Sequence, residues 1–331
     1  MSFQVGTAPI KRVAMLTNPA AGKGAATRIA DRARGHLNEL GVDVVAIQGS
    51  TAAASRELAA AMVADDRIDA LVVCGGDGLI SLALQEQAQS GKPLGIIPAG
   101  TGNDHAREYN IPTDPLKAAE VVAAGFWTTT DLGRMRQCEE GAFGARGDMA
   151  SLDISGIDAV STSWFGTIAC AGFDSLVSDR TNKITWPKGR NRYNLAIVME
   201  FVNFHSIPTR LVLDPGMETQ RVLDGKVTLC AMGNTRSYGG GMKICPDADH
   251  HDGLLDVTIL GQLSKPKVAA KFGKIFSGNI RDEEGIDLHR AHSVAIDMPG
   301  INGYADGDLF APLPMLVEIV PGAGRYIVPR P

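Results

Sequence analysis

The sequence of 331 residues contains no uninterrupted apolar run of about 18 residues, the length that a membrane-spanning helix requires. It also has no long apolar segment near its first residue, which a secretory signal peptide would need. We therefore expect neither a transmembrane helix nor an export signal. Any contact with lipid is expected to come from the aqueous side of a membrane.

Cysteine is scarce and basic residues are not in excess. The five cysteines include no Cys-x-x-Cys pair and their number is odd, so we expect free thiols in a reducing cytoplasm rather than a disulfide framework. The 37 acidic residues outnumber the 32 lysines and arginines, which leaves a net charge of −5. Proteins that bind nucleic acid are usually clearly basic, so no nucleic-acid partner is expected.

Short apolar runs alternate with helical patterns in residues 1–132. The predicted strands are Arg12–Thr17, Val42–Ile47, Ala70–Cys74, Leu94–Ile97 and Trp127–Leu132, and the predicted helices are Ala25–Leu40, Ala52–Ala64 and Ile80–Gln89. Thr51 and Thr113 are predicted helix N-caps, and Pro115 suits a first helical turn. This alternation predicts an α/β domain with a mostly parallel sheet.

The pattern changes after residue 132, and the chain exceeds the usual size of a single core, so a second domain is expected over residues 133–310. The strands predicted after residue 132 are Trp164–Ala171, Thr209–Leu213, Lys226–Ala231, Gly253–Leu260, Ser293–Met298 and Leu316–Val320, and the predicted helices are Tyr193–Phe204 and Lys265–Ile275. Residues 136–162 are predicted to form a loop. Strands separated by turn residues predict a mainly antiparallel β domain.

Two glycine-rich turns follow predicted strands of the first domain. One is Gly75-Gly76-Asp77-Gly78, and the other is Pro98-Ala99-Gly100-Thr101-Gly102-Asn103-Asp104. Backbone N–H groups in such a turn form an anion cradle with the helix N-terminus behind them, and glycine allows a phosphate to approach closely. Two such turns in tandem, each with an aspartate, predict a phosphate-binding edge of the sheet.

A third glycine-rich turn, Asn18-Pro19-Ala20-Ala21-Gly22-Lys23-Gly24, follows the first predicted long strand. It does not match the P-loop pattern, because Thr17 stands where the first glycine belongs and Gly24 stands where Ser or Thr is needed. We interpret it as a further anion-binding turn, with a simple strand–helix connection as the alternative.

These three turns together resemble the catalytic domain shared by diacylglycerol kinases and sphingosine kinases. The second half carries matching motifs, which are Gly233-Asn234-Thr235, Gly239-Gly240-Gly241, Cys245-Pro246, Asp252-Gly253-Leu254-Leu255-Asp256 and Tyr304-Ala305-Asp306-Gly307-Asp308. The resemblance covers nearly the whole chain and is strongest to soluble actinobacterial diacylglycerol kinases. It implies a two-domain fold in which residues 311–331 return to complete the first domain.

The resemblance implies ATP as phosphate donor, Mg²⁺, and transfer of the γ-phosphoryl group to a lipid hydroxyl, with diacylglycerol as the expected acceptor. The lipid partner would be met at a membrane surface, so we expect a cytoplasmic protein that associates peripherally with the inner face of the membrane. The residues predicted to bind the nucleotide are Asn18, Pro19, Gly22, Thr51, Gly75, Gly76, Asp77, Gly78, Gly100, Thr101, Gly102, Asn103 and Asp104.

The resemblance also predicts the general base. In the family, the acidic residue after Asp-Gly near the C-terminus has this role, and here that position is Asp308, where many relatives carry Glu. Asp306 is the second candidate. The alternative is a hairpin turn flanked by solvated acids.

A metal site is predicted in the acidic segment 247–256. By resemblance, Asp252 would hold a structural Mg²⁺ together with the backbone carbonyls of Asp249 and Leu254. A polar loop without an ion is the alternative. The neighbouring His250 and His251 lack the spacing of a zinc site.

Other functions remain open from sequence alone. The acceptor could be sphingosine, ceramide or a glycolipid, and a nicotinamide-nucleotide kinase shares the Gly-Gly-Asp-Gly turn. A catalytically silent nucleotide- or lipid-binding regulator is favoured only by Leu79, where relatives carry Thr, and by Asp308. The basic and aromatic segment Lys183–Tyr193 suits a membrane interface and a solvated loop equally well. A homodimer is compatible with the sequence.

Overall fold

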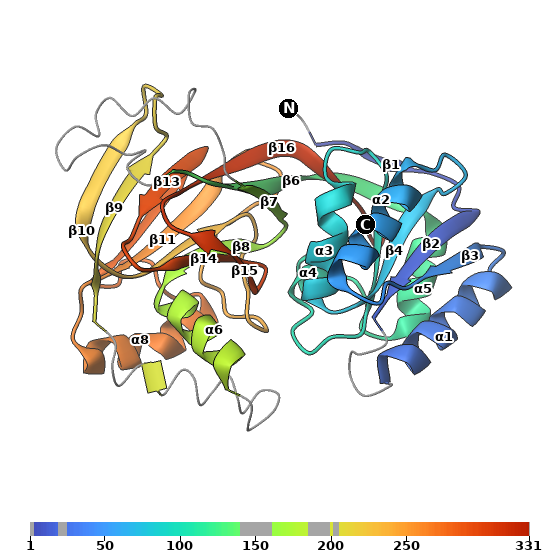
Figure 1. Cartoon of the computed structure of the whole chain (residues 1–331), viewed down its shortest axis with the longest axis horizontal. Coiled ribbons are helices and arrows are strands. Elements are labelled where there is room, and N and C mark those ends of the chain that lie inside the picture. Colours follow the sequence, from blue (N-terminus) through green and yellow to red (C-terminus); the bar gives the residue numbers. More distant parts are fainter. Residues whose placement is uncertain (1–2, 19–24, 140–160, 185–198, 201–204, 331) are drawn as a thin grey trace.

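The computed structural model describes residues 3–18, 25–139, 161–184, 199–200 and 205–330. Figure 1 shows two bodies joined by a pair of long strands, with the N-terminal residues in one body and most of the later strands in the other. Predicted elements in the remaining segments, including the helix Tyr193–Phe204 and most of the loop 136–162, lie outside the described residues. No helix of the described part is long and apolar enough to cross a membrane.

The first body is built on four parallel strands in the order β5-β4-β2-β3. Their bounds are β2 Arg12–Thr17, β3 Asp43–Ile47, β4 Ala70–Gly75 and β5 Leu94–Pro98, and the helices are α1 Ala25–Glu39, α2 Ala52–Ala64, α3 Asp77–Gln87, α4 Asp104–Glu108 and α5 Pro115–Ala124. Every residue of β4 and β5 is buried, as expected for strands of a parallel sheet with both faces covered. All strands and helices predicted for residues 11–132 are present, and their bounds differ by a few residues.

Helix caps explain where two of these helices begin. Thr51 is the N-cap of α2, and its Oγ1 accepts a hydrogen bond from the backbone N–H of Ala54 at 3.1 Å, as predicted. For α5 the predicted cap, Thr113, is wrong by one residue. Asp114 is the N-cap, because its carboxylate accepts hydrogen bonds from the backbone N–H groups of Leu116 and Lys117, and Pro115 follows in the first turn.

The second body is an antiparallel sheet with helices at one end. Its strands are β7 Ser161–Phe165, β8 Ile168–Gly172, β9 Ile207–Leu213, β10 Arg221–Gly233, β11 Leu255–Gly261, β12 Ile286–Ala291, β13 Ser293–Asp297, β14 Asn302–Ala305 and β15 Asp308–Pro312. The helices α6 Phe173–Lys183 and α8 Lys265–Ser277 lie together at the lower edge of this body in Figure 1. The predicted mainly antiparallel β domain is therefore confirmed.

Two long strands connect the bodies. β6 Phe126–Gln137 and β16 Met315–Ile327 pair antiparallel along nearly their whole length, with a bulge between Val320 and Gly324. Met315 and Val317 belong to the core of the second body, whereas Tyr326 and Ile327 belong to the core of the first.

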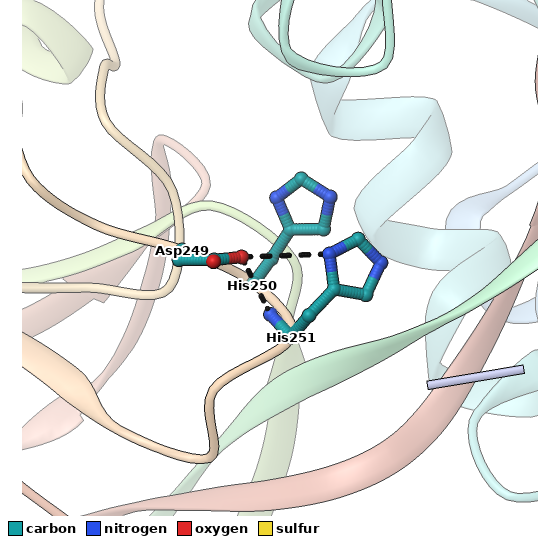
Figure 2. Close-up of side chains that lie close together, drawn as sticks. All are labelled: Asp249, His250 and His251. Carbon is teal, nitrogen blue, oxygen red and sulfur yellow. Dashed lines mark hydrogen bonds and ion pairs between the residues drawn. The ribbon is translucent and has the colours of Figure 1, made fainter. Parts of the chain in front are cut away.

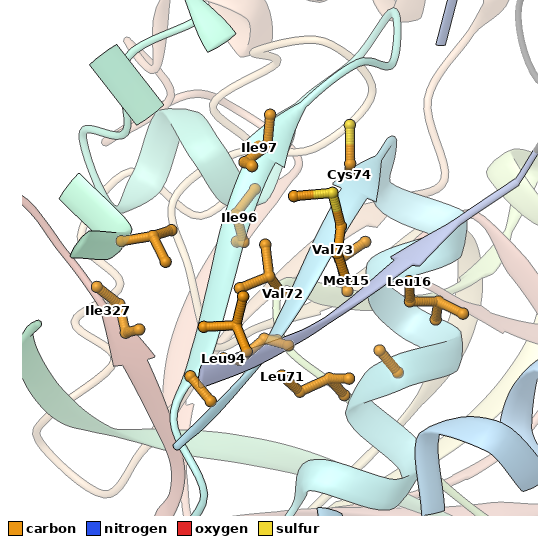
Figure 3. Close-up of a cluster of buried hydrophobic side chains, with 14 of the residues drawn as sticks. Met15, Leu16, Leu71, Val72, Val73, Cys74, Leu94, Ile96, Ile97 and Ile327 are labelled. Atoms are coloured by element: carbon orange, nitrogen blue, oxygen red, sulfur yellow. The ribbon is translucent and has the colours of Figure 1, made fainter. Parts of the chain in front are cut away.

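The return of the chain to the first sheet places β16 next to β5, where Tyr326 pairs with Leu94. Figure 3 shows Ile327 beside the buried side chains of β4 and β5. β1 Val5–Thr7 pairs with β6. The domain boundaries proposed from sequence, at residues 132 and 310, remain predictions. Because β6 and β16 each run through both bodies, neither body ends at a single residue of these strands.

One predicted strand is wrong in an informative way. The run Trp164–Ala171 forms two strands, β7 and β8, separated by Gly166 and Thr167. The backbone N–H groups of these two residues do not pair with a neighbouring strand. They donate hydrogen bonds to the carboxylate of Asp306, which the apolar pattern of the segment could not indicate.

Candidate active site

The two glycine-rich turns come together at the carboxyl edge of the parallel sheet. The β4 turn, Gly75–Gly78, and the β5 turn, Pro98–Asp104, follow adjacent strands, and Gly75 pairs with Pro98. A Cβ on Gly100 would lie 2.5 Å from Cα of Gly76, so no other residue fits at Gly100 without moving the backbone. The backbones of the two turns therefore pack directly against each other, and glycine at these positions makes that contact possible.

The shape of the β5 turn is maintained by Asn103. Its Oδ1 accepts a hydrogen bond from the backbone N–H of Gly100 at 3.0 Å, and its Nδ2 donates to the carbonyl of Gly100 at 3.1 Å. Asn103 has φ of 52°, a left-handed conformation that asparagine tolerates better than most residues. Thr101 is left exposed at the tip of the turn.

Asp77 begins helix α3 and lies beside the β5 turn. Its Oδ1 accepts a hydrogen bond from the backbone N–H of His105 at 3.2 Å, and a Cβ on Gly102 would lie 2.8 Å from its Oδ2. Burial acts to raise the pKa of Asp77, but the hydrogen bond and the charge of His105 outweigh it and hold the pKa below its usual value. Asp77 is therefore an anionic group packed against the backbone of the β5 turn.

Asp104 is oriented differently. Its carboxylate accepts hydrogen bonds from the backbone N–H of Gly240, with the shorter contact at 2.9 Å, and it pairs with Arg107. Burial is the main reason that its pKa is raised, although both partners oppose the shift. Asp104 thus joins the β5 turn to the glycine segment 239–241 of the second body.

His105 is fully buried between carboxylates of the two bodies. Its Nδ1 lies 3.4 Å from Asp77 Oδ1, and its Nε2 lies 3.7 Å from Asp306 Oδ2. Burial acts to lower the pKa of His105, but the negative charges of Asp306 and Asp77 outweigh it, so the pKa is raised. A Cβ on Gly166 would lie 2.4 Å from Nε2, which makes glycine necessary at that position.

Asp306 is held rigidly. Its Oδ2 accepts a hydrogen bond from the N–H of Gly166 at 2.8 Å, and its Oδ1 accepts from both the backbone N–H and the hydroxyl of Thr167. Its own φ is 51°, and Gly307 follows at 86°. This turn directs the next residue, Asp308, out of the second body.

Asp308 lies next to the β4 turn. A Cβ on Gly78 would lie 3.7 Å from Asp308 Oδ2, and the hydroxyl of Ser81 on helix α3 donates a hydrogen bond to the carboxylate. The residue as a whole is exposed, but the protein around its carboxylate displaces water and Asp306 adds negative charge, so its pKa rises to about 6. A carboxylate that titrates near neutral pH therefore lies beside a phosphate-binding turn, an arrangement suited to proton removal during phosphoryl transfer.

Comparison with known proteins identifies the family of the chain. Residues 12–135 match the family model described as diacylglycerol kinase catalytic domain, and residues 167–328 match the model of the YegS C-terminal NAD kinase beta sandwich-like domain. A diacylglycerol kinase of Mycobacterium tuberculosis is 46% identical over 322 residues, which cover 97% of this chain and 96% of that protein. The chain belongs to the diacylglycerol kinase family of lipid kinases.

More distant relatives of this kinase match over most of the chain. A probable lipid kinase, YegS-like, of Stenotrophomonas maltophilia is 27% identical over 308 residues, covering 89% of this chain and 90% of that protein. The crystal structure of a diacylglycerol kinase from Bacillus anthracis str. Sterne has a TM-score of 0.67 at 16% identity, and covers 97% of this chain and 98% of that one. At this identity the structural likeness shows the fold alone.

The predicted metal segment of the kinase forms a compact loop before β11. Asp252 Oδ1 accepts a hydrogen bond from the backbone N–H of Leu254 at 2.9 Å, and its Oδ2 pairs with Arg290. The carbonyl of Asp249 accepts the N–H of Asp252 at 3.3 Å. The oxygen donors suit Mg²⁺, although Arg290 would compete with a cation for the carboxylate. Binding of Mg²⁺ by Asp249, Asp252 and Leu254 remains a prediction.

The adjacent histidines have partners of their own. Figure 2 shows the carboxylate of Asp249 directed at His251, whose N–H lies 3.1 Å away and whose Nδ1 lies 3.4 Å away. His250 Nδ1 faces a carboxylate oxygen of Glu108 at 3.6 Å. Among the described residues, Asp249, His250 and His251 are the group whose potential ligand atoms are close enough to share an ion.

The remaining predicted nucleotide ligands are only partly described. Pro19 and Gly22 lie outside the described residues, and Asn18 lies at the end of β2, at the same edge of the sheet as the two turns. Thr51 uses its hydroxyl oxygen to cap α2. Roles for these residues in nucleotide binding stay predictions.

Several site residues could not be found by motif reasoning. His105 is one of them, and it lies buried between Asp77 and Asp306. Its position directly after Asp104, at the start of a helix that follows a phosphate turn, was the only available signal. Thr167 and Ser81 gave no signal in the sequence. Thr167 contacts Asp306 and Ser81 contacts Asp308, and each contact joins segments more than a hundred residues apart.

Removal of the Asp252 carboxylate tests the predicted Mg²⁺ site. If Asp252 binds Mg²⁺ only in the folded protein, Mg²⁺ raises the melting temperature of the parent but not of Asp252→Ala. The readout is the difference in melting temperature with and without chelator. Arg290→Gln is the matched control, because it breaks the same ion pair and leaves the carboxylate. An equal response to Mg²⁺ in parent and Asp252→Ala would refute the site.

Proposed function

We propose that this lipid kinase transfers the γ-phosphoryl group of ATP, with Mg²⁺, to the hydroxyl of diacylglycerol and so produces phosphatidic acid. The observation that carries the proposal is the Asp308 carboxylate, with its pKa raised to about 6, beside Gly78 of the β4 turn. A carboxylate suited to activating the acceptor thus lies beside a glycine turn suited to binding phosphate, although the two are far apart in the sequence.

The proposed reaction uses these groups in sequence. The backbone of the β4 and β5 turns binds the ATP phosphates at the N-terminus of α3. The lipid hydroxyl oxygen attacks the γ-phosphorus, its proton passes to Asp308, and the bond from the γ-phosphorus to the bridging oxygen breaks to release ADP. Asp306 is a weaker candidate for the base, because both of its oxygens already accept hydrogen bonds from Gly166 and Thr167.

Asp77 is the residue proposed to hold the catalytic Mg²⁺. Its carboxylate is anionic, and its Oδ2 lies against Gly102 of the β5 turn, beside the carboxylate of Asp104. A divalent cation there would neutralise charge on the ATP phosphates during transfer. The carboxylate of Asp104 is a poorer ligand as the protein stands, because the N–H of Gly240 and Arg107 already occupy it.

Diacylglycerol is proposed as acceptor because the relative with 46% identity over nearly the whole of both chains is named a diacylglycerol kinase. The lipid would be taken from a membrane surface that the protein contacts peripherally. Incubation with labelled ATP, Mg²⁺ and separate samples of diacylglycerol, sphingosine, ceramide and NAD tests this. Label is expected in diacylglycerol. Label mainly in another lipid would replace the acceptor, and label in NAD or in none of them would refute the proposal.

Asp77→Ala should weaken the use of ATP without unfolding the protein. The lost carboxylate removes the proposed Mg²⁺ ligand, and we expect KM for ATP to rise by at least about tenfold, since one lost charge interaction is worth a kilocalorie or more. The measurement is steady-state kinetics with ATP varied at saturating lipid, together with the melting temperature. Asp66→Ala is the control, because this exposed aspartate precedes β4 at the opposite edge of the sheet. Parent-like KM values for ATP would remove Asp77 from the site.

A further inference from the structure

Gln85 on helix α3 uses all of the hydrogen-bonding groups of its side chain. Its Nε2 donates to the backbone carbonyl of Trp164 at 2.8 Å and to that of Ser81, one helical turn earlier, at 2.9 Å. Its Oε1 accepts from the backbone N–H of Trp164 at 2.9 Å and from the hydroxyl of Ser163 at 3.2 Å. A primary amide has two N–H donors and two acceptor lone pairs, so the capacity of this side chain is filled.

The contacts of Gln85 with β7 join the two bodies. α3 packs into the core of the first body, whereas β7 belongs to the second and pairs with β6 along one edge. At the other edge, the N–H and the carbonyl of Trp164 both bind the Gln85 amide. The amide therefore takes the place that one residue of a neighbouring strand would have. Figure 1 shows β7 on the side of the second body that faces α3.

The ring of Trp164 reinforces this contact. It packs against the core of the first body, although the next residue, Phe165, belongs to the core of the second. The guanidinium of Arg134 lies over the ring, 5.4 Å from its centroid, and Arg134 also pairs with Glu318 on β16. Directional hydrogen bonds from the amide and apolar packing of the ring thus hold β7 against α3 together.

One side of this contact leads to Asp308. Gln85 binds the carbonyl of Ser81, and the hydroxyl of Ser81 donates a hydrogen bond to the carboxylate of Asp308. Gly78, three residues before Ser81, is the position of the β4 turn that lies beside the same carboxylate. The segment of α3 that Gln85 fixes is therefore the segment that contacts Asp308.

The other side of this contact leads to Asp306. Two residues after Trp164, the chain forms the turn Gly166–Thr167, whose backbone N–H groups donate hydrogen bonds to the carboxylate of Asp306. Asp306 in turn precedes Asp308 by two residues. Gln85 is thus bonded to both segments that determine where Asp308 lies, the first turns of α3 and the strand before the Asp306 turn.

We propose that Gln85 is a positioning residue for phosphoryl transfer, which keeps the Asp308 carboxylate beside the phosphate-binding β4 turn by holding β7 on α3. The inference rests on the proposed function, because the step that Gln85 serves is the removal of the lipid hydroxyl proton by Asp308. Gln85 itself touches neither substrate nor Asp308 and acts through Ser81 and through β7.

Gln85→Ala tests this role in steady-state kinetics. The variant should lower kcat for diacylglycerol in detergent micelles by about 10- to 100-fold, because a misplacement of about 1 Å at the reacting groups has an effect of this size. KM for ATP should stay within about twofold of the parent value, since both phosphate-binding turns and Asp77 lie in the first body. A parent-like kcat in the folded variant would overturn the proposal.

Gln87→Ala is the matched control on the same helix. Gln87 is fully buried, and its Nε2 donates to the carbonyls of Lys92 and Arg325, neither of which lies on β7. Its loss should lower the melting temperature at least as much as Gln85→Ala but leave kcat at the parent value. If Gln87→Ala reduced kcat to the same extent, general loosening of α3 would explain the effect and the proposal would fail.

A double-mutant cycle shows whether Gln85 acts through Asp308. In the Asp308→Asn background there is no base to position, so adding Gln85→Ala should lower the remaining rate by less than about threefold. A further loss as large as that in the parent background would show that Gln85 acts independently of Asp308, which contradicts the proposal.

A milder variant covers the case in which Gln85→Ala does not fold. Ser163→Ala removes the hydroxyl that donates to Oε1 of Gln85 and leaves the backbone contacts in place. It should lower kcat by about threefold without changing KM for ATP, in proportion to the loss of one hydrogen bond. A parent-like kcat in Ser163→Ala would then count against the proposal.

Hydrogen exchange measured by mass spectrometry distinguishes this proposal from the proposed function. Peptides that contain residues 161–168 should exchange faster in Gln85→Ala, because the N–H of Trp164 loses its acceptor, but not in Gln87→Ala. Unchanged exchange in these peptides would refute the contact as the cause of any kinetic effect. If the parent phosphorylates no lipid, the proposed function fails, while the exchange still decides whether Gln85 holds β7 on α3.

Discussion

Asp308→Asn should lower the rate of lipid phosphorylation by roughly 10²–10⁴-fold, the usual contribution of a general base. The amide keeps the size and hydrogen bonding of the side chain but cannot accept the hydroxyl proton. The binding of ATP should persist, because the backbone of the β4 and β5 turns is unchanged. The measurement is the lipid phosphorylation rate alongside ATP affinity, with Asp282→Asn, at an exposed turn of the second body, as control.

The pH dependence of the parent follows from the same carboxylate. Because the pKa of Asp308 is raised to about 6, it is protonated and inactive as a base below that value, and kcat/KM should rise with pH through about 6 and then level off. A raised carboxylate pKa favours folding only at low pH, and this contribution is lost as pH increases through 6. Asp308→Asn should therefore melt at or above the parent temperature near pH 7.

Two results would decide against Asp308. Asp308→Asn with the parent rate excludes it as the base, and an unchanged pH profile in Asp308→Glu, whose carboxylate extends one methylene further, would show that another group titrates near 6. Some activity is expected from the Glu variant, because glutamate retains a carboxylate that can accept the proton.

Asp306→Ala should reduce both stability and activity. The carboxylate accepts the N–H groups of Gly166 and Thr167 in a buried turn, and its loss leaves these donors without partners. Loss of one member of a buried charged network costs about 3–5 kcal/mol, which corresponds to a decrease in melting temperature on the order of 10 °C. Lipid phosphorylation should fall by about 100-fold, because Asp308 would be displaced from the β4 turn.

A second substitution at Asp306 separates a structural role from a chemical one. Asp306→Asn is the matched variant, because asparagine tolerates the left-handed φ of 51° and keeps one acceptor oxygen, so it should lose less stability than Asp306→Ala. Thermal unfolding and phosphorylation rates are measured on the same samples. An Asp306→Ala protein that melts like the parent but is inactive would instead point to Asp306 as a direct participant in the chemistry.

Local patterns were sufficient for most of the first body. The strands β2, β4 and β5 are short, apolar and followed by glycine or proline, and the helices between them have a regular apolar spacing, so periodicity identified them closely. The glycine-rich turns were recognisable for the same reason. Their geometry depends on backbone conformations that glycine and asparagine supply locally.

Local sequence patterns could not predict the pairing of strands that are far apart in the sequence. β6 was predicted only to Leu132, yet it continues to Gln137 because β16 provides a hydrogen-bonding partner along its whole length. The second half of β6 is rich in polar and charged residues, and Arg134 is stabilised there by Glu318 across the strand pair at 2.8 Å. Pairing between residues nearly two hundred positions apart leaves no periodic signal in either segment.

The sequence by itself determined the family motifs, the parallel order of strands and helices at the start, and the identity of the acidic residues that could act. Only the tertiary structure decided which acid is available as the base. The backbone N–H groups of Gly166 and Thr167 already donate hydrogen bonds to the carboxylate of Asp306, whereas the carboxylate of Asp308 lies beside Gly78. It also decided the place of His105 and the raised pKa of Asp308. These properties depend on burial and on charges brought together from distant segments, and neither is encoded at any single position of the chain.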